Sequence, residues 1–179
     1  MVDVIDDIRD EHVAIARVLD IVEQELEMMQ RGEQVDYEIL LDAAFYLTEY
    51  SDLFHHTKED LVYRRLRRRR RRAADLVSGL EGEHDTLRRL GLAVAETVED
   101  ITDDVMVDRA DLGRRIREYV LAQREHMERE EREFLPLAEK TLTEEDWAEI
   151  RSTLASGGAS GVRDITKERF RSLYRRLSG

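Results

Sequence analysis

The chain has 179 residues, 41% of them hydrophobic, and a formal net charge of −12 at pH 7, which suits one compact acidic domain with a substantial core. The absence of cysteine excludes disulfides, thiolate zinc sites and iron–sulfur clusters, so any bound metal must be held by nitrogen and oxygen. The negative charge disfavours general binding to nucleic acid or anionic lipid, because both require a basic surface.

A single proline and only nine glycines interrupt the chain, which predicts an all-α fold built from long helices. The N-terminal residues lack the basic start and apolar run of a secretory signal, and no stretch is long enough to span a bilayer. We therefore expect a cytoplasmic protein with no membrane association.

The first predicted helix carries a histidine in its buried stripe. The stripe advances by alternating steps of three and four residues, which is typical of one face of an amphipathic helix. It consists of Ile5, Ile8, His12, Ile15, Leu19, Val22, Leu26 and Met29. His12 thus occupies a position where an aliphatic side chain is expected.

A second helix, predicted over residues 36–66, brings a histidine and a glutamate together. Its inner face comprises Leu41, Ala44, Thr48, Ser51, His55, Glu59, Val62 and Leu66. Because His55 and Glu59 are four residues apart, their side chains lie one turn apart on the same face.

The third and fourth predicted helices repeat this arrangement. The inner face of the third contains Leu76, Leu80, His84, Leu87, Gly91, Val94, Val98 and Ile101. That of the fourth contains Leu112, Ile116, Tyr119, Gln123, His126, Glu130, Phe134 and Leu137. Four long helices joined by short links predict an antiparallel up-down-up-down bundle, which would bring the histidines and glutamates to one level of the core.

Six side chains are therefore candidate metal ligands: His12, His55, Glu59, His84, His126 and Glu130. They belong to a duplicated pattern, because positions 12 and 84 are 72 apart and positions 55 and 126 are 71 apart. Four imidazoles and two carboxylates suit a dinuclear centre in which the carboxylates bridge two metals and oxo, hydroxo or water completes the bridge. Iron is the expected metal and manganese is possible. Zinc is less suited, because one tetrahedral zinc would leave two ligands idle.

Two alternatives to this centre are less favoured. A lone histidine in a helical stripe is usually a satisfied core residue, but six such groups together would be costly without a cation. Ferritin-like di-iron proteins use two Glu-x-x-His pairs and two further glutamates, whereas only Glu81 and His84 fit that spacing here.

Over about residues 4–140 the sequence resembles the haemerythrin-like family, the HHE cation-binding domain. The motifs that carry the resemblance are Glu11-His12, His55 through Asp60, Glu83-His84, and His126 through Glu131 leading into Phe134-Leu135-Pro136. The resemblance implies a non-haem di-iron site that binds or reacts with dioxygen, nitric oxide or peroxide, or that senses iron.

The chain departs from the invertebrate oxygen carriers of that family. They have a second histidine on the third helix, where this chain has Arg88, and they end with a histidine and an aspartate, where this chain has His126 and Glu130. These differences put reversible oxygen carriage in doubt. His56 could supply a fifth nitrogen, but it lies about 100° around the helix from His55, so we expect a polar neighbour near the rim of the site or behind its ligands.

Two aromatic residues, Tyr63 and Phe134, each follow a candidate histidine by eight positions. They could wall the site against water, but ordinary core packing is the favoured interpretation.

Residues 1–140 are expected to form the bundle, and residues 141–179 a helical extension packed on it. Thr143 and Asp146 have the spacing of a capping box and open a short helix with Trp147, Ile150 and Leu154. A glycine-rich break follows Ser156. A last helix is predicted from about Asp164, with Phe170, Leu173, Tyr174 and Leu177 on one face, which is either buried or a partner surface.

Eight arginines occupy the nine positions from Arg64 to Arg72. Arginines at a helix C-terminus complement its dipole, and a solvated helix end is the favoured interpretation. A binding patch for an acidic protein partner or an anion is the alternative.

Three functional hypotheses follow. The chain could bind a gaseous ligand reversibly, or it could be an enzyme that reduces peroxide or nitric oxide or oxidises ferrous iron. It could also be an iron or redox sensor, or an adaptor, whose metal occupancy controls partner binding through the C-terminal helix. The sequence does not rank the first two.

Overall fold

The computed structural model describes residues 4–156, 173, 175 and 176, and every regular element among them is a helix, as predicted. The α-helices are α1 (Val4–Gln30), α2 (Tyr37–Phe45), α3 (His56–Arg69), α4 (Arg71–Ala74), α5 (Leu80–Thr102), α6 (Arg109–Arg129), α7 (Leu135–Thr141) and α8 (Glu144–Ser156). The predicted break after Ser156 and most of the predicted last helix lie outside the described residues. No helix in the described part of the chain is long and apolar enough to cross a bilayer.

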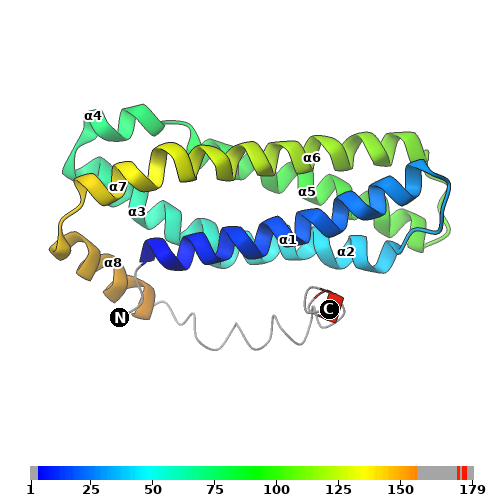
Figure 1. Ribbon diagram of the computed structural model, residues 1–179, viewed down its shortest axis with the longest axis horizontal. Helices are drawn as coiled ribbons and strands as arrows, with labels where there is room; N and C mark the ends of the chain where they lie inside the picture. Colours follow the sequence, from blue (N-terminus) through cyan, green and yellow to red (C-terminus); the bar gives the residue numbers. More distant parts are fainter. Residues whose placement is uncertain (1–3, 157–172, 174, 177–179) are drawn as a thin grey trace.

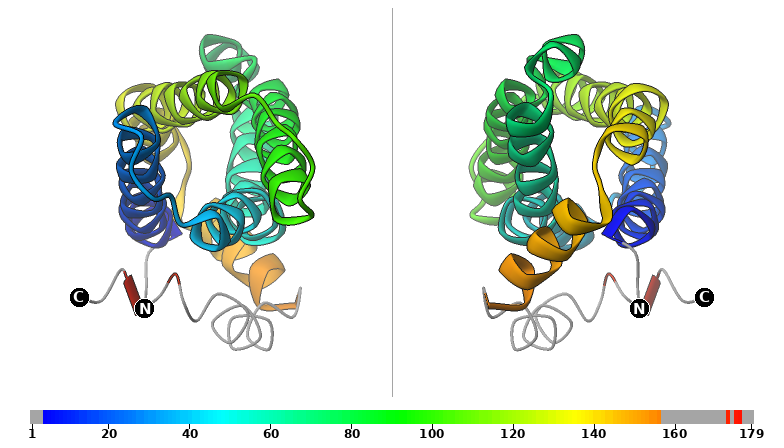
Figure 2. Two further views of the ribbon diagram at one scale, coloured as in Figure 1. Left: turned by 90° about the vertical axis from the view of Figure 1, so that its right-hand side faces the viewer. Right: turned by 90° about the vertical axis from the view of Figure 1, so that its left-hand side faces the viewer.

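The long helices lie side by side along one axis (Figure 1). Helix α1 packs against α2 and α6, α2 packs against α5, and α5 packs against α6. Seen end-on, these helices surround a common centre (Figure 2). Their inner faces therefore meet in one interior, which receives the apolar and histidine stripes of the sequence.

Two segments of the long helices are π-helical. They are η1 (Tyr46–His55), which joins α2 to α3, and η3 (Glu130–Phe134), which joins α6 to α7. The backbone N–H of His56 donates to the carbonyl of Ser51, and that of Leu135 donates to the carbonyl of Glu130, each five residues back. Wider turns of this kind are frequent at functional sites, and here both adjoin candidate ligands.

The third predicted helix begins later than expected, at Leu80 instead of near Leu76. Residues 71–77 form the short helix α4 and the 3₁₀ helix η2 (Asp75–Val77). Gly79 then adopts a φ of +108°, a left-handed conformation that glycine tolerates and other residues rarely adopt. This turn redirects the chain into α5.

Two apolar clusters fill the interior, and the candidate ligands lie between them. On α1 the two clusters contain Ile8 and Ile15, on either side of His12. At the junction of α6 and α7 they contain Met127 and Phe134, on either side of Glu130. The histidine layer is thus shielded from water on both sides along the bundle axis.

Helix α8 begins with the predicted capping box. The N–H of Thr143 donates to Oδ2 of Asp146 at 2.9 Å, and the N–H of Asp146 donates to Oγ1 of Thr143 at 3.4 Å. Asp146 also accepts hydrogen bonds from Arg65 at 2.5 Å and from Arg69 at 2.7 Å. Burial opposes ionisation of Asp146, but the bonds from Arg69, Thr143 and Arg65 outweigh it and lower the pKa of this carboxyl.

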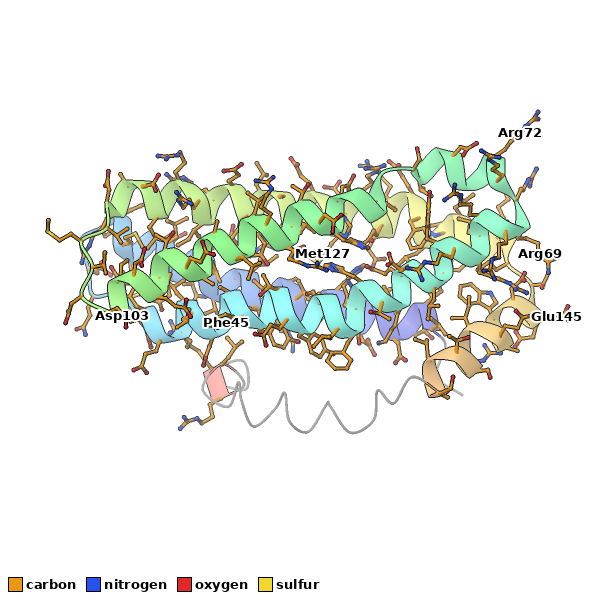
Figure 3. The ribbon with its side chains drawn as sticks, turned by 180° about the vertical axis from the view of Figure 1, so that it is seen from behind. Phe45, Arg69, Arg72, Asp103, Met127 and Glu145 are labelled. Atoms are coloured by element: carbon orange, nitrogen blue, oxygen red, sulfur yellow. The ribbon has the colours of Figure 1, made fainter. Side chains whose placement is uncertain are left out.

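Two members of the arginine run from Arg64 to Arg72, here called the arginine patch, therefore have a structural role. Arg69 and Glu145 lie at the same end of the molecule, far from Asp103 (Figure 3). Arg65 and Arg69 fasten α8 to that end, while Trp147 and Ile150 join the apolar cluster beneath it. Arg72 and its neighbours in the patch are exposed, and a partner for them stays a prediction.

Candidate metal centre

The structure brings together all six predicted ligands and one further histidine. Two groups of residues could each hold a metal ion, with ligand atoms that all lie within 4.8 Å of one another. The first group is His12, His55, Glu59 and Glu130, and the second is His56, Glu59, His84 and His126. All seven side chains are buried, with exposed fractions of 7% or less. Glu59 belongs to both groups, so they adjoin.

His56 is buried among the candidate ligands, so the expectation that it lies near the rim is wrong, and its role as a ligand or as a polar neighbour stays a prediction. Its ring stacks on that of His84 with centroids 4.0 Å apart and an interplanar angle of 8°. The expectation assumed an ideal α-helical turn throughout. The π-helical segment that ends at His55 shifts the inward face by one residue, so His55 and His56 both face the core.

Glu59 faces histidines of both groups with different oxygens. Its Oε1 atom lies 3.1 Å from Nε2 of His55 and 3.4 Å from Nε2 of His12. Its Oε2 atom lies 3.5 Å from Nε2 of His84. A carboxylate in this position can contact two cations at once.

Glu130 has the same relationship to both groups. Its Oε2 atom lies 3.3 Å from Nε2 of His12, whereas its Oε1 atom lies 3.3 Å from Nε2 of His126 and 3.9 Å from Nε2 of His84. Glu130 is 0% exposed. Both acidic residues of the repeated His-x-x-x-Glu pairs therefore lie between the histidines of the two groups.

The ligand-type atoms lack hydrogen-bond partners within the described part of the chain. They are Nε2 of His12, His55, His84 and His126, and both carboxylate oxygens of Glu59 and Glu130. Eight unsatisfied polar atoms at one buried point would be strongly destabilising, since buried polar atoms are normally paired. Cations coordinated by these nitrogens and oxygens would satisfy them, so the donor set fits a metal centre.

The pKa shifts of these side chains also indicate a site that requires positive charge. Burial and the charge of Glu130 raise the pKa of Glu59 to about 8. Burial opposes protonation of His12 and His84, but nearby carboxylates outweigh it and raise the pKa of each to about 10. Burial lowers the pKa of His55 to about 4. Positive charge is thus required beside these carboxylates, as protons or as metal ions.

An outer ring of carboxylates contacts the other nitrogen of four histidines. The contacts to Nδ1 are His12 with Glu131 at 2.7 Å, His55 with Glu11 at 3.2 Å, His84 with Asp60 at 3.5 Å and His126 with Glu83 at 2.9 Å. An ionised carboxylate can only accept a hydrogen bond, so it favours the tautomer with the proton on Nδ1. The Nε2 lone pair is then available to a metal.

The sequence interpretation missed these four carboxylates, although the duplication contained the signal. Glu11 and Glu83 directly precede His12 and His84, and Asp60 and Glu131 directly follow Glu59 and Glu130. They repeat with the ligands because each one supports a histidine on a neighbouring helix.

Two of these carboxylates also contact a basic side chain, and the arrangement is repeated in the two halves of the chain. Lys58 contacts Glu11, and Arg129 contacts Glu83. Both cations stand three residues after a histidine, His55 and His126 respectively. Burial raises the pKa of Glu11, but the hydrogen bond from His55 and the charge of the buried Lys58 outweigh it and lower this pKa. Glu11 is thereby kept ionised as an acceptor for His55.

Tyr63 and Phe134 pack in the apolar cluster next to the site. Their ring centroids are 6.3 Å apart at an interplanar angle of 53°, and both side chains are buried. This agrees with the core-packing interpretation of the sequence.

The chain packs its helices around a buried cluster of histidines and carboxylates. This arrangement is typical of helical cation-binding proteins whose ligand atoms are nitrogen and oxygen alone. Within that class the family is specific: a family model described as Hemerythrin HHE cation binding domain matches residues 3–138, and the chain belongs to this family. Comparisons with curated proteins and with solved structures found no match.

Proposed function

We propose that the chain is a non-haem di-iron protein that binds or reacts with dioxygen, nitric oxide or peroxide at a dinuclear centre in an up-down-up-down four-helix bundle. The observation that carries this proposal is the pair of adjoining ligand groups that share Glu59. Three histidines would serve one ion and two would serve the other, and Glu59 and Glu130 would bridge them. The donor set of nitrogen and oxygen suits iron, and manganese is the next candidate.

The protein groups would prepare the centre in three ways. The outer carboxylates fix the tautomer of the histidines, the bridging glutamates supply compensating charge, and the two apolar clusters exclude bulk water. A bound pair of irons would supply electrons and open coordination positions for chemistry with oxygen, nitric oxide or peroxide.

Metal analysis and a visible spectrum of the purified protein test the proposal. We expect about two irons per chain and an absorption band from the oxo bridge, which nitric oxide or peroxide perturbs. Stoichiometric loading with one ion, or an iron protein whose spectrum responds to none of these ligands, would overturn it. Sustained consumption of peroxide or nitric oxide, lost in His84→Ala, would identify an enzyme instead of a carrier.

A sensor or adaptor is the second candidate function, and two contacts favour it. Leu173 is fully buried in the larger apolar cluster, and Arg176 contacts the buried Glu25 at 2.6 Å. Residues near the C-terminus therefore touch the bundle and could report on its metal occupancy. A C-terminal region whose protease susceptibility changes on iron loading, without turnover, would support this function.

A further inference from the structure

A groove of about 490 Å³ runs between α1 and α6 and leads to His12. Val13, Ala16 and Met127 give it apolar walls. The ring of His12 lines it, with Nδ1 turned to Glu131, which also lines the groove, and Nε2 turned to the carboxylates of Glu59 and Glu130. The groove thus ends on a candidate ligand.

The charged residues of this groove are held by partners. Arg9 contacts Glu131 and Glu139, and Arg124 contacts Asp20 and Glu23. Glu128, which also lines the groove, contacts Arg132. Their charges are therefore balanced locally. An apolar path with balanced charges at its rim favours uncharged molecules over anions, because a charged molecule would lose its hydration there.

The duplicated half of the chain has a corresponding groove with a different character. It lies between α5 and α6 beside His126, and its volume is about 330 Å³. Arg129 lines it, contacts Glu83 and donates a hydrogen bond to the carbonyl of Ser78 at 3.1 Å. The ion pair of Arg129 and Glu83 thus borders the approach to His126, together with Leu87 and Ala122. The approach to His12 is bordered instead by Val13, Ala16 and Met127.

Met127 is suited to act as a gate in the first groove. It is 8% exposed, belongs to the larger apolar cluster and lies about midway along the bundle (Figure 3). A methionine side chain has three rotatable bonds and moves aside at low cost. We propose, on the basis of the proposed dinuclear centre, that the α1–α6 groove is the route by which an uncharged diatomic molecule, dioxygen or nitric oxide, reaches that centre past Met127.

Stopped-flow measurement of nitric oxide binding to the reduced, iron-loaded protein tests the route. A path changes association and dissociation rates by the same factor and leaves Kd unchanged, because it alters neither end state. We expect Ala16→Trp to lower both rates by about tenfold, as for an obstructed gate, and Met127→Ala to raise both. Ala122→Trp, which fills the α5–α6 groove, is the matched control and should leave both rates unchanged.

Iron content and circular dichroism establish that each variant is folded and loaded. Should Ala16→Trp fail to fold, Val13→Trp carries the same test, because Val13 is 54% exposed and tolerates a larger side chain. Slower binding in Ala122→Trp with normal binding in Ala16→Trp would overturn the route, and so would a changed Kd at unchanged association rate. An iron-loaded wild-type protein that binds no nitric oxide would instead overturn the proposed function, and the route with it.

Discussion

The Nδ1 atom of His126 on α6 lies 2.9 Å from Oε2 of Glu83 on α5, and His55 has the same relationship to Glu11 at 3.2 Å. The duplicated halves thus repeat a histidine together with the carboxylate that orients it. Each carboxylate comes from the helix that precedes its histidine. The orientation of each of these histidine rings therefore depends on a contact between two helices, and so on the assembled bundle.

Replacing the orienting carboxylate should weaken metal binding without removing a ligand. We expect Glu83→Gln to lower iron affinity by about 10- to 100-fold, the usual effect of losing such a partner. An iron titration with a competing chelator measures this change. Glu96→Gln, an exposed position on the same helix, is the control and should bind iron like the wild-type protein. Equal affinities in the two variants would contradict the orienting role.

Metal binding at pH 7.5 should release protons. With pKa values of about 10 for His12 and His84 and about 8 for Glu59, these groups hold protons when no cation is present. A cation can bind only to their deprotonated forms, so we expect release of about two to three protons per chain. Calorimetric titrations in buffers of different ionisation enthalpy measure this number. A binding enthalpy that is independent of the buffer would rule out the exchange.

The contacts of Asp146 with Arg65 and Arg69, which hold α8 to the bundle, should raise the free energy of unfolding above acidic pH. Because the pKa of Asp146 is lowered in the folded state, its contribution is present above the unfolded pKa of about 4 and is lost as pH falls toward the folded value. We expect Asp146→Asn to lower the free energy of unfolding by about 2 kcal/mol at pH 7. The difference from wild type should shrink below about pH 4. Urea unfolding at several pH values measures it, and a difference that grows in acid would have the wrong sign.

Alanine substitutions at Gly91 and Gly82 should have opposite effects on stability, because Gly91 is closely packed and Gly82 is not. A Cβ atom there would lie 2.4 Å from Cγ2 of Thr48 and 3.0 Å from Cζ of Tyr119, whereas a Cβ at Gly82 would meet no atom within 4 Å. We expect Gly91→Ala to destabilise the protein by about 1–3 kcal/mol through overpacking. Gly82→Ala should be neutral or stabilising by up to about 1 kcal/mol, because alanine is the better helix former. Thermal unfolding compares them, and equal effects would contradict the close approach.

The sequence predicted the helical class and six members of the candidate site because both depend on local periodicity and on a visible duplication. His56 was misplaced because a π-helical turn depends on backbone packing that the α-helical spacing rule does not contain. The pairing of Arg65 and Arg69 with Asp146 was not predicted, because it joins segments far apart in the chain. Periodicity identifies which face is buried, but it does not identify which charged groups meet across helices.

Iron loading of Glu59→Ala tests the central claim most directly, because Glu59 is the residue that the two ligand groups share. Glu133→Ala, at an exposed position on η3, is the control. We predict that the purified control retains about two irons per chain, and that Glu59→Ala, without the carboxylate that both groups share, retains fewer than about one. Full loading of Glu59→Ala, with an unaltered visible spectrum, would contradict the account.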